Sequence, residues 1–328
     1  MDAVAAFEPK KRRRDEQGPP ASSYGSDDAG LDLISPILSS RWHHIWRSTP
    51  LNLIVDDGVS RNERKGIAVV SKILAAHPGP ACRFSSRTLL HRGFYTKLDD
   101  WFRSPALDGL EKLEFHGDDM LSLQLPPSAF RFAHTLRAIG INRCNVPKIN
   151  TATALRFPRL KKLKLYEVPI SEAALQHLLA GCTALEILEL QDIHGLGTVR
   201  IVSQTLRCIG FSVCRYYKVD VVFHELVIED APSLERLIQL HNNGPKTIRV
   251  ISAPKLVMLG CPRISKLVIG NVIIKEMIPI SFTASVRTVK ALVLNSVGHN
   301  LDAIIGFLRC FPCVEKLHIQ VNIFFVKC

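Results

Sequence analysis

The 328-residue sequence has few aromatic side chains, no long apolar run and no regular set of cysteines. The absence of a continuous apolar stretch of about 18 residues argues against a membrane-spanning helix. The first residues are polar, unlike those of a secretory signal peptide. The nine cysteines are odd in number and scattered, as in proteins whose thiols stay reduced. These absences predict a soluble intracellular protein of the nucleus, the cytoplasm or both, with no membrane partner.

The chain also lacks the motifs that carry enzyme chemistry. It has no glycine-rich phosphate loop, no nucleophile elbow and no pair of acids at a strand end. Cys310 and Cys313 have CxxC spacing, but one such pair supplies only half of a tetrahedral zinc site. His43 and His44 are adjacent and would diverge by about 100° on a helix. The sequence therefore predicts a non-catalytic protein with no metal and no cofactor.

A repeated apolar pattern occupies most of the remaining sequence. Residues 160–165 read Leu-Lys-Lys-Leu-Lys-Leu, with apolar side chains at the first, fourth and sixth places. The fourth and sixth side chains leave the same face of a strand, and stacked copies bury that face in one core. The spacing of 17–26 residues is typical of a leucine-rich-repeat solenoid, although an ordinary α/β domain with leucine-rich strands is the alternative. The first places of the ten copies are 110, 136, 160, 185, 206, 223, 245, 264, 289 and 314.

The predicted fold is an α/β leucine-rich-repeat solenoid of about ten parallel strands, helix-backed at both ends and strand-backed in the middle. Copies of about 25 residues have room for a helix, at residues 172–180 after the capping residue Ser171 and at Leu301–Arg309. The copies between 206 and 264 are too short for one. We expect extended segments there, at residues 234–240 and 256–259 on the convex side.

Three segments precede the repeats. Residues 1–30 are rich in charge, Pro, Gly and Ser and are predicted to be a disordered arm. Their basic run at 10–14 resembles a nuclear localisation signal, with a solvated charge cluster as the alternative. Within residues 31–50, one short helix is predicted after Pro36. Residues 51–109 are predicted to form an N-terminal cap on the solenoid of residues 110–328.

The cap is expected to contain a strand and two helices. The apolar run Leu51–Val55 predicts the strand, and helical spacing of apolar residues predicts helices at 65–77 and 95–103.

The charge is concentrated in the predicted solenoid and not in the arm. Residues 1–30 carry five basic and six acidic side chains and are net −1, so the other 298 residues must carry +13 to give the formal net charge of +12. This excess favours acidic partners or nucleic-acid phosphate.

The third, fifth and seventh places of each copy should point to solvent on the concave face. Charges of both signs alternate there without interleaved aromatic residues, which argues against a nucleic-acid partner. A protein target fits better, with a solvated face that binds nothing as the alternative. Lys162, Lys164 and Tyr166 are the best local candidates. The predicted target-binding residues are Lys112, Glu114, Lys162, Lys164, Tyr166, Glu189, Glu225 and Lys316.

Several strings resemble plant F-box/leucine-rich-repeat proteins of the F-box/FBD/LRR type. Arg41-Trp42-His43-His44-Ile45-Trp46, followed by Pro50-Leu51-Asn52-Leu53, resembles the end of their F-box. Residues 225–237 and 248–256 resemble their central repeats, and residues 300–317 resemble a later one. The resemblance extends over about residues 31–320.

This resemblance implies a non-catalytic substrate receptor. In that family the F-box docks on a Skp-type adaptor of an SCF-type cullin–RING ubiquitin ligase while the repeats hold a target. The residues implied in adaptor binding here are Leu38, Arg41, Trp42, Ile45 and Trp46.

The sequence departs from the family pattern at both ends. The Leu-Pro-containing first helix and the second helix of a complete F-box are missing before Arg41, and no FBD domain follows the repeats. A truncated gene model or a splice form would explain both departures. They leave a second hypothesis open, a leucine-rich-repeat scaffold without coupling to a ubiquitin ligase.

Overall fold

The computed structural model describes residues 49–55, 63–77, 80–86, 92–117, 124–145, 156–213, 223–241, 244–260, 265–280, 284–295 and 301–320. The chain divides into two compact units, Met1–Trp46 and Arg47–Cys328. All described residues belong to the second unit. The predicted arm and most of the predicted F-box helix lie outside the described residues.

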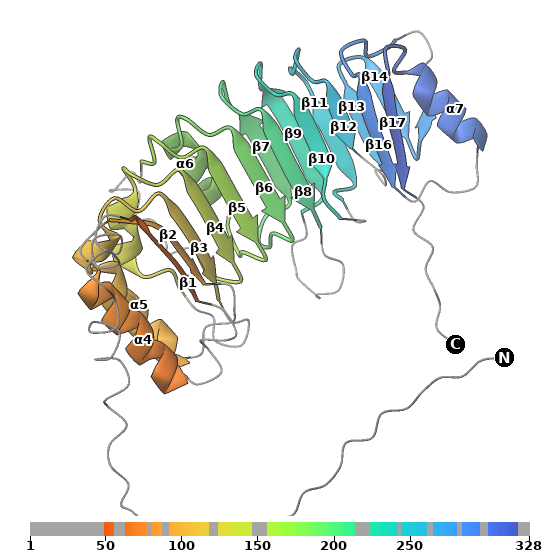
Figure 1. Cartoon of the computed structure of the whole chain (residues 1–328). Coiled ribbons are helices and arrows are strands. Elements are labelled where there is room, and N and C mark those ends of the chain that lie inside the picture. Colours follow the sequence, from red (N-terminus) through yellow and green to blue (C-terminus); the bar gives the residue numbers. More distant parts are fainter. Residues whose placement is uncertain are drawn as a thin grey trace, which may run out of the picture. The chain divides into compact units, whose positions relative to one another are not determined.

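An eleven-stranded sheet, which we call the main sheet, runs through the second unit (Figure 1). Its strands pair in parallel, which confirms the predicted solenoid of stacked parallel strands. Its strands in order are β1 (Leu51–Val55), β2 (Ala81–Ser86), β3 (Lys112–His116), β4 (Ala138–Asn142), β5 (Lys162–Tyr166), β6 (Ile187–Gln191), β8 (Cys208–Ser212), β10 (Arg236–Gln239), β12 (Met258–Gly260), β16 (Ala291–Asn295) and β17 (Lys316–Gln320).

The fourth-place side chains of the repeat form one continuous row inside the core. Leu113 pairs in register with Ile139, which pairs with Leu163, and the row continues through Leu188 and Ile209. All five are at most 6% exposed. Burying a Leu or Ile side chain contributes about 1.5–3 kcal/mol, so these rows hold adjacent repeats together.

A second sheet packs behind the middle of the main sheet. Its parallel strands send Val199, Ile201, Leu226, Ile228 and Ile248 into the same buried core. Its order is β15 (Ile278–Pro279), β14 (Val272–Lys275), β13 (Lys266–Ile269), β11 (Thr247–Val250), β9 (Glu225–Asp230) and β7 (Thr198–Val202), with β14 antiparallel to both β13 and β15. The predicted strand-backed middle is confirmed.

The prediction of which middle segments form the main sheet is wrong. The copies at 223, 245 and 264 give β9, β11 and β13 of the second sheet, whereas the segments 234–240 and 256–259, expected on the convex side, overlap β10 and β12 of the main sheet.

The cause is that both layers bury one face in the same core, so both carry similar apolar patterns. Residues 223–228 fill the first, fourth and sixth places with Phe, Leu and Ile, but residues 234–239 end on Gln239. Gln239 nevertheless occupies the inward sixth place, 4% exposed, and its Nε2 donates to the His241 carbonyl over 2.8 Å.

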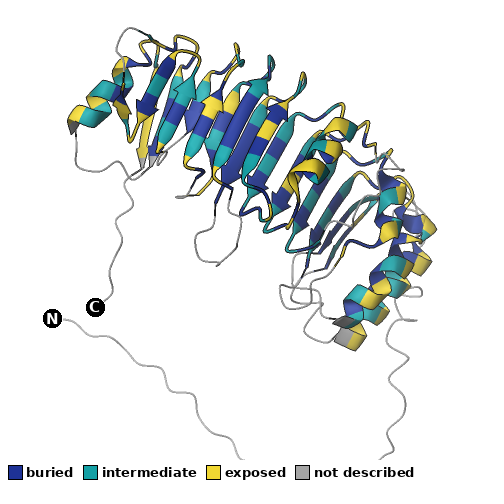
Figure 2. Cartoon of the chain, turned by 180° about the vertical axis from the view of Figure 1, so that it is seen from behind, coloured by how far each residue is buried: buried dark blue, intermediate teal, exposed yellow. Residues whose placement is uncertain are grey.

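Helices cover the parts of the core that the second sheet does not. Helix α6 (Glu172–Gly181) lies behind the main sheet (Figure 2). Its N-terminus is capped by Ser171, whose Oγ accepts from the Ala174 amide over 3.3 Å, as predicted. Helix α7 (Leu301–Arg309) contacts β15 and confirms the predicted last helix. None of the helices among the described residues is long and apolar enough to cross a membrane.

The segment predicted as a cap contributes both strands and helices. Strand β1 confirms the predicted strand, and α4 (Glu63–Ala76) and α5 (Arg92–Phe102) lie where helices were expected. Short 3₁₀ helices follow at η2 (Pro105–Leu107) and η3 (Pro127–Phe132). The strand β2 was not predicted, because Phe84 is the only large apolar side chain in Ala81–Ser86.

Aromatic side chains close the core at the β2 end. The Phe84 ring meets the Phe102 ring edge-on with centroids 5.2 Å apart, and Phe102 meets Phe132 in the same way at 6.0 Å. At the β17 end the inward side chains of Leu317 and Ile319 are 41% and 48% exposed. Their register partners Leu292 and Leu294 are buried. The described residues therefore cover the core at one end of the sheet better than at the other.

Candidate functional site

One face of the main sheet points away from the second sheet and the helices. On β5, Leu163 and Leu165 are buried in the core while Lys162, Lys164 and Tyr166 point the other way. Strand pairing in register extends this alternation across the sheet. We call the outward side chains the open face. Its described members on β2 to β17 are Arg83, Ser85, Lys112, Glu114, His116, Ala138, Gly140, Asn142, Lys162, Lys164, Tyr166, Ile187, Glu189, Gln191, Cys208, Gly210, Ser212, Arg236, Ile238, Met258, Gly260, Ala291, Val293, Lys316 and His318.

A carboxylate on β3 gathers three donors on the open face. Glu114 accepts from Arg83 Nη2 at 2.7 Å, from Ser85 Oγ at 2.7 Å and from Lys112 Nζ at 2.9 Å. Burial raises the pKa of Glu114, but the hydrogen bonds from Ser85, Arg83 and Lys112 outweigh it and lower the pKa to about 2. Glu114 is therefore ionised at neutral pH, and two cations share its single charge.

A second carboxylate on β6 is arranged in the same way. Glu189, whose side chain is 15% exposed, pairs with Lys162 Nζ at 3.2 Å and with Lys164 Nζ at 2.7 Å. Strand β4 lies between the two clusters, and the residues that it places beside them are Ala138 and Gly140. Each cluster thus keeps one uncompensated positive charge, and the two flank a strand with almost no side chain.

Between β8 and β16 the open face is mostly apolar, with Ser212 and Arg236 as its polar members there and Lys316 and His318 following on β17. Cys208, Ile238, Met258, Ala291 and Val293 occupy its outward positions and are half-buried. Gly210 and Gly260 stand between them in the middle row. Leu240, 36% exposed, packs so closely over Gly210 that an added Cβ there would lie 2.9 Å from Leu240 Cδ1. One sheet face therefore carries two chemically different halves.

Three neighbouring strands of the main sheet, β4, β5 and β6, end in backbone that is hydrogen-bonded to the next strand. Arg143, Glu167 and Asp192 each follow a strand with φ of 50° to 54°. This strained backbone is held because each amide donates to the next strand's carbonyl, over 2.9 to 3.1 Å.

The side chains at this edge are paired as well. The Arg143 guanidinium pairs with Glu167, whose side chain is 8% exposed. Burial, then the hydrogen bond to Glu167, raises the pKa of Tyr166 to about 12. Burial also raises the pKa of Asp192, which accepts from Ser212 Oγ over 3.2 Å.

The opposite edge carries charges that cancel in pairs. Lys161 Nζ lies 2.7 Å from Glu186, Arg207 Nη2 lies 2.7 Å from Glu235, and Lys290 Nζ lies 2.9 Å from Glu315. An open groove runs past the first two pairs. Because its charges are matched in pairs, this edge should attract a charged ligand less strongly than the open face does.

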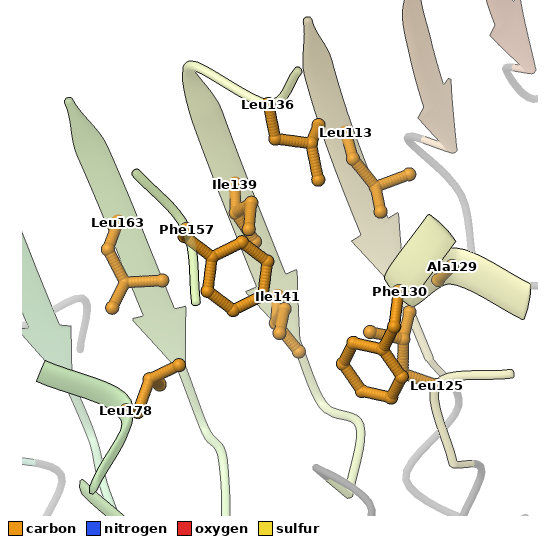
Figure 3. A pocket seen from close by; sticks show the side chains of 10 residues that line it. All are labelled: Leu113, Leu125, Ala129, Phe130, Leu136, Ile139, Ile141, Phe157, Leu163 and Leu178. Carbon is orange, nitrogen blue, oxygen red and sulfur yellow. The ribbon is translucent and has the colours of Figure 1, made fainter. Parts of the chain in front are cut away.

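An apolar cavity lies inside the solenoid, between β3, β4, β5 and the segments behind them (Figure 3). Its volume is about 20 Å³, and its ten lining side chains are all apolar. A space of this size holds no more than about one water, and this one offers no hydrogen-bond partner. We therefore assign no ligand to it.

The structure brings six of the eight predicted target-binding residues together. Lys112, Glu114, Lys162, Lys164, Tyr166 and Glu189 lie on the open face of β3, β5 and β6. The expected position of Glu225 in the main sheet is wrong, because it lies on β9 of the second sheet, 3.4 Å from Arg249. Lys316 is on the open face of β17, six strands beyond β5 and about 29 Å away at the usual strand spacing.

The sequence reasoning missed Arg83 and Ser85 on β2 and Arg236 and Ile238 on β10. The segment 234–239 does carry Leu at the first and fourth places, which could have identified β10 as a main-sheet candidate. For β2 the sequence offers no comparable signal. The predicted adaptor-binding residues Leu38, Arg41, Trp42, Ile45 and Trp46 lie outside the described residues.

The structure shows the state of several cysteines. Cys144 is buried, and burial raises its pKa to about 12. Cys310 is buried and Cys313 exposed, both free. Within the described part of the chain no three His, Cys, Asp or Glu side chains are grouped to hold a metal ion.

Comparison with known proteins matches the repeat region. The family model for the LRR repeats of FBD-associated F-box protein At5g56370 covers residues 98–319. Two relatives come from Arabidopsis thaliana. F-box/FBD/LRR-repeat protein At1g13570 is 23% identical over 62% of this chain and 47% of its own length. Putative FBD-associated F-box protein At5g22720 is 26% identical over 66% of this chain and 47% of its own length.

The chain spans about half the length of these relatives. No solved structure gives a significant match. The family model covers two thirds of the chain, over the residues that form the main sheet from β3 onward and the second sheet behind it. The chain therefore belongs to the family defined by the leucine-rich repeats of FBD-associated F-box proteins.

Proposed function

We propose that this chain is a non-catalytic recognition protein that binds a protein target on its open face. The observation that carries this proposal is the open face itself, a row of parallel strands whose outward side chains are covered by no described element. Solenoids generally use such extended faces to bind other macromolecules. Membership of a family whose members carry F-box names supports the same class of role.

The finer proposal is a substrate receptor of an SCF-type cullin–RING ubiquitin ligase. In this role residues 31–50 would contact a Skp-type adaptor, and Leu38, Trp42, Ile45 and Trp46 would supply the apolar contact at helical spacing. Arg41 would lie beside them.

The second candidate is a scaffold that binds its target without delivering it for ubiquitination. It is favoured by one observation, that the sequence of residues 31–40 contains no Leu-Pro pair like that of an F-box first helix. For either role we propose a nuclear or cytoplasmic location. Imaging of the tagged full chain tests it, with residues 10–14 replaced by alanine to identify a nuclear signal.

Co-purification of the full chain with a Skp-type adaptor tests the receptor role. The receptor hypothesis expects a complex that the double substitution Trp42→Ala and Trp46→Ala abolishes. The open-face substitution Lys164→Glu should leave this complex intact, because it lies on the solenoid. Failure of the unsubstituted chain to bind any Skp-type adaptor would favour the scaffold.

A further inference from the structure

The open face carries an excess of cations over β2 to β10. Among its described residues there, five cations (Arg83, Lys112, Lys162, Lys164 and Arg236) face two carboxylates, Glu114 and Glu189. Arg83 and Lys112 share one carboxylate, and Lys162 and Lys164 share the other. Arg236 forms no ion pair with a described residue. A ligand with several carboxylates would complete these pairings.

Between Arg236 on β10 and Lys316 on β17, the open face presents no charged side chain. Over β10, β12 and β16 the outward positions next to Arg236 are filled by Ile238, Met258, Ala291 and Val293. Gly260 stands between Ile238 and Val293 in the same row, and a Cβ added there would contact both at 3.5 Å. Aliphatic side chains of a ligand would be desolvated here.

The two halves are separated by a length that an extended peptide can span. Lys164, Ile238 and Val293 occupy the same outward row, on β5, β10 and β16. With strands about 4.8 Å apart, Lys164 lies about 14 Å from Ile238 and about 24 Å from Val293. At about 3.3 Å per residue these distances correspond to about four and about seven residues of extended chain.

The same face is poorly suited to single-stranded nucleic acid. Among its described side chains on β2 to β17, Tyr166 is the one with a phenol, indole or phenyl ring. Binding of unpaired bases normally uses a series of such rings beside the cations. The strands β10, β12 and β16 instead present Ile238, Met258, Ala291 and Val293, which suits a peptide.

We propose that the open face binds an extended target segment in which acidic residues lie about four to seven residues from aliphatic ones. The acidic residues lie over β3 to β6, and the aliphatic residues lie over β10 to β16. This inference deepens the proposed function and rests on it, since it names the chemistry of the target that the open face takes.

Fluorescence anisotropy on the full chain tests the inference directly. The probes are a labelled peptide Glu-Glu-Glu-Glu-Gly-Ser-Gly-Leu-Val-Leu and its reversed sequence. Comparison probes replace all glutamates by lysine or all aliphatic residues by serine, and an oligothymidylate serves as the nucleic acid. We expect one of the first two peptides to bind more tightly than every comparison probe.

Matched substitutions identify the face that is used. We expect Lys164→Glu to weaken the complex about tenfold and Val293→Ser to weaken it about threefold, because each removes one half of the contact. Lys275→Glu and Val202→Ser make the same chemical changes at exposed positions of the second sheet and should alter affinity less than about twofold.

Three results would overturn the inference. The first is that the peptide without aliphatic residues binds as tightly as the original peptides, and the second is that Lys275→Glu weakens binding as much as Lys164→Glu. The third is that the oligothymidylate binds more tightly than the peptides, with an affinity that falls steeply with added salt. The last result would instead assign the cations to nucleic acid.

Selection of random dodecamer peptides on the full chain separates the inference from the proposed function. Enriched peptides that are acidic and aliphatic, and that lose affinity in Lys164→Glu and Val293→Ser, support both. Enriched peptides of another composition that still depend on these two positions contradict the inference and retain the open face as the target site. Peptides that depend on neither position contradict both.

Discussion

Arg83 on β2 donates a hydrogen bond of 2.7 Å from Nη2 to Oε2 of Glu114 on the neighbouring strand β3. The two residues are 31 positions apart in the sequence, and Ser85 and Lys112 donate to the same carboxylate. The open face is therefore more than a set of solvated side chains, because a partly buried carboxylate holds two adjacent strands together at the β2 end of the main sheet.

Replacing Glu114 by Gln should lower the free energy of unfolding by about 1–3 kcal/mol at neutral pH. The pKa of Glu114 is lowered from an ordinary 4.5 to about 2, so the carboxylate stabilises the fold above its unfolded pKa. This contribution is lost as pH falls from about 4.5 to about 2. Urea unfolding of both proteins between pH 2 and 7 measures it.

The control for this prediction is Glu111→Gln, which changes an exposed carboxylate just before the same strand. It should cost less than about 1 kcal/mol, as expected for a surface ion pair. If the stability difference between the unsubstituted chain and Glu114→Gln stayed constant down to pH 2, the assignment of the lowered pKa would be wrong.

Replacing Arg236 by Cys should produce a disulfide with Cys208. The two positions are register partners on β10 and β8. Adjacent strands lie about 4.8 Å apart, within the usual Cα separation of a disulfide, about 4.4–6.8 Å. Mild oxidation followed by mass spectrometry of the linked peptides detects the bond.

Glu225→Cys is the matched control for this cross-link. It would face Cys208 if β9 followed β8 in the main sheet, but β9 lies in the second sheet. If Cys208 formed a disulfide in the Glu225→Cys protein but none in the Arg236→Cys protein, the strand order in the middle of the solenoid would be wrong.

Replacing Arg143 by Met should destabilise the fold by about 2–4 kcal/mol, because it leaves the carboxylate of Glu167, 8% exposed, without its guanidinium. Lys161→Met, which breaks the exposed pair with Glu186, should cost less than about 1 kcal/mol. Urea unfolding at low and high salt checks both values. Equal losses from the two substitutions would contradict the difference in burial.

Replacing Leu163 by Ala should cost about 2–5 kcal/mol, because it removes a side chain 1% exposed from a row that spans neighbouring strands. Lys255→Ala, at an exposed position outside the strands, should change the free energy of unfolding by less than about 0.5 kcal/mol. Chemical unfolding followed by circular dichroism measures both. A small effect of Leu163→Ala would mean that the stacked rows contribute little to stability.

The elements with a strong local pattern were predictable. Strands such as β5 alternate large aliphatic residues with charged ones, and α6 directly follows a serine that caps it. The same alternation is enough to identify Lys162 and Lys164 as outward residues. Their shared pairing with Glu189 was not predictable, because it depends on which strand lies next to β5 and in which register.

By itself, the sequence determined that strands stack with one apolar side inward and that the two ends are backed by helices, since periodicity and capping residues are local properties. Only the tertiary structure decided which of two similar apolar segments enters which sheet, because both bury one side in the same core. The structure shows that Arg236 and Ile238 lie on the open face and that Glu225 lies in the second sheet. That choice depends on how each whole repeat packs against its neighbours. Even a buried Gln239 is accommodated in the main sheet, because its Nε2 donates to the backbone carbonyl of His241.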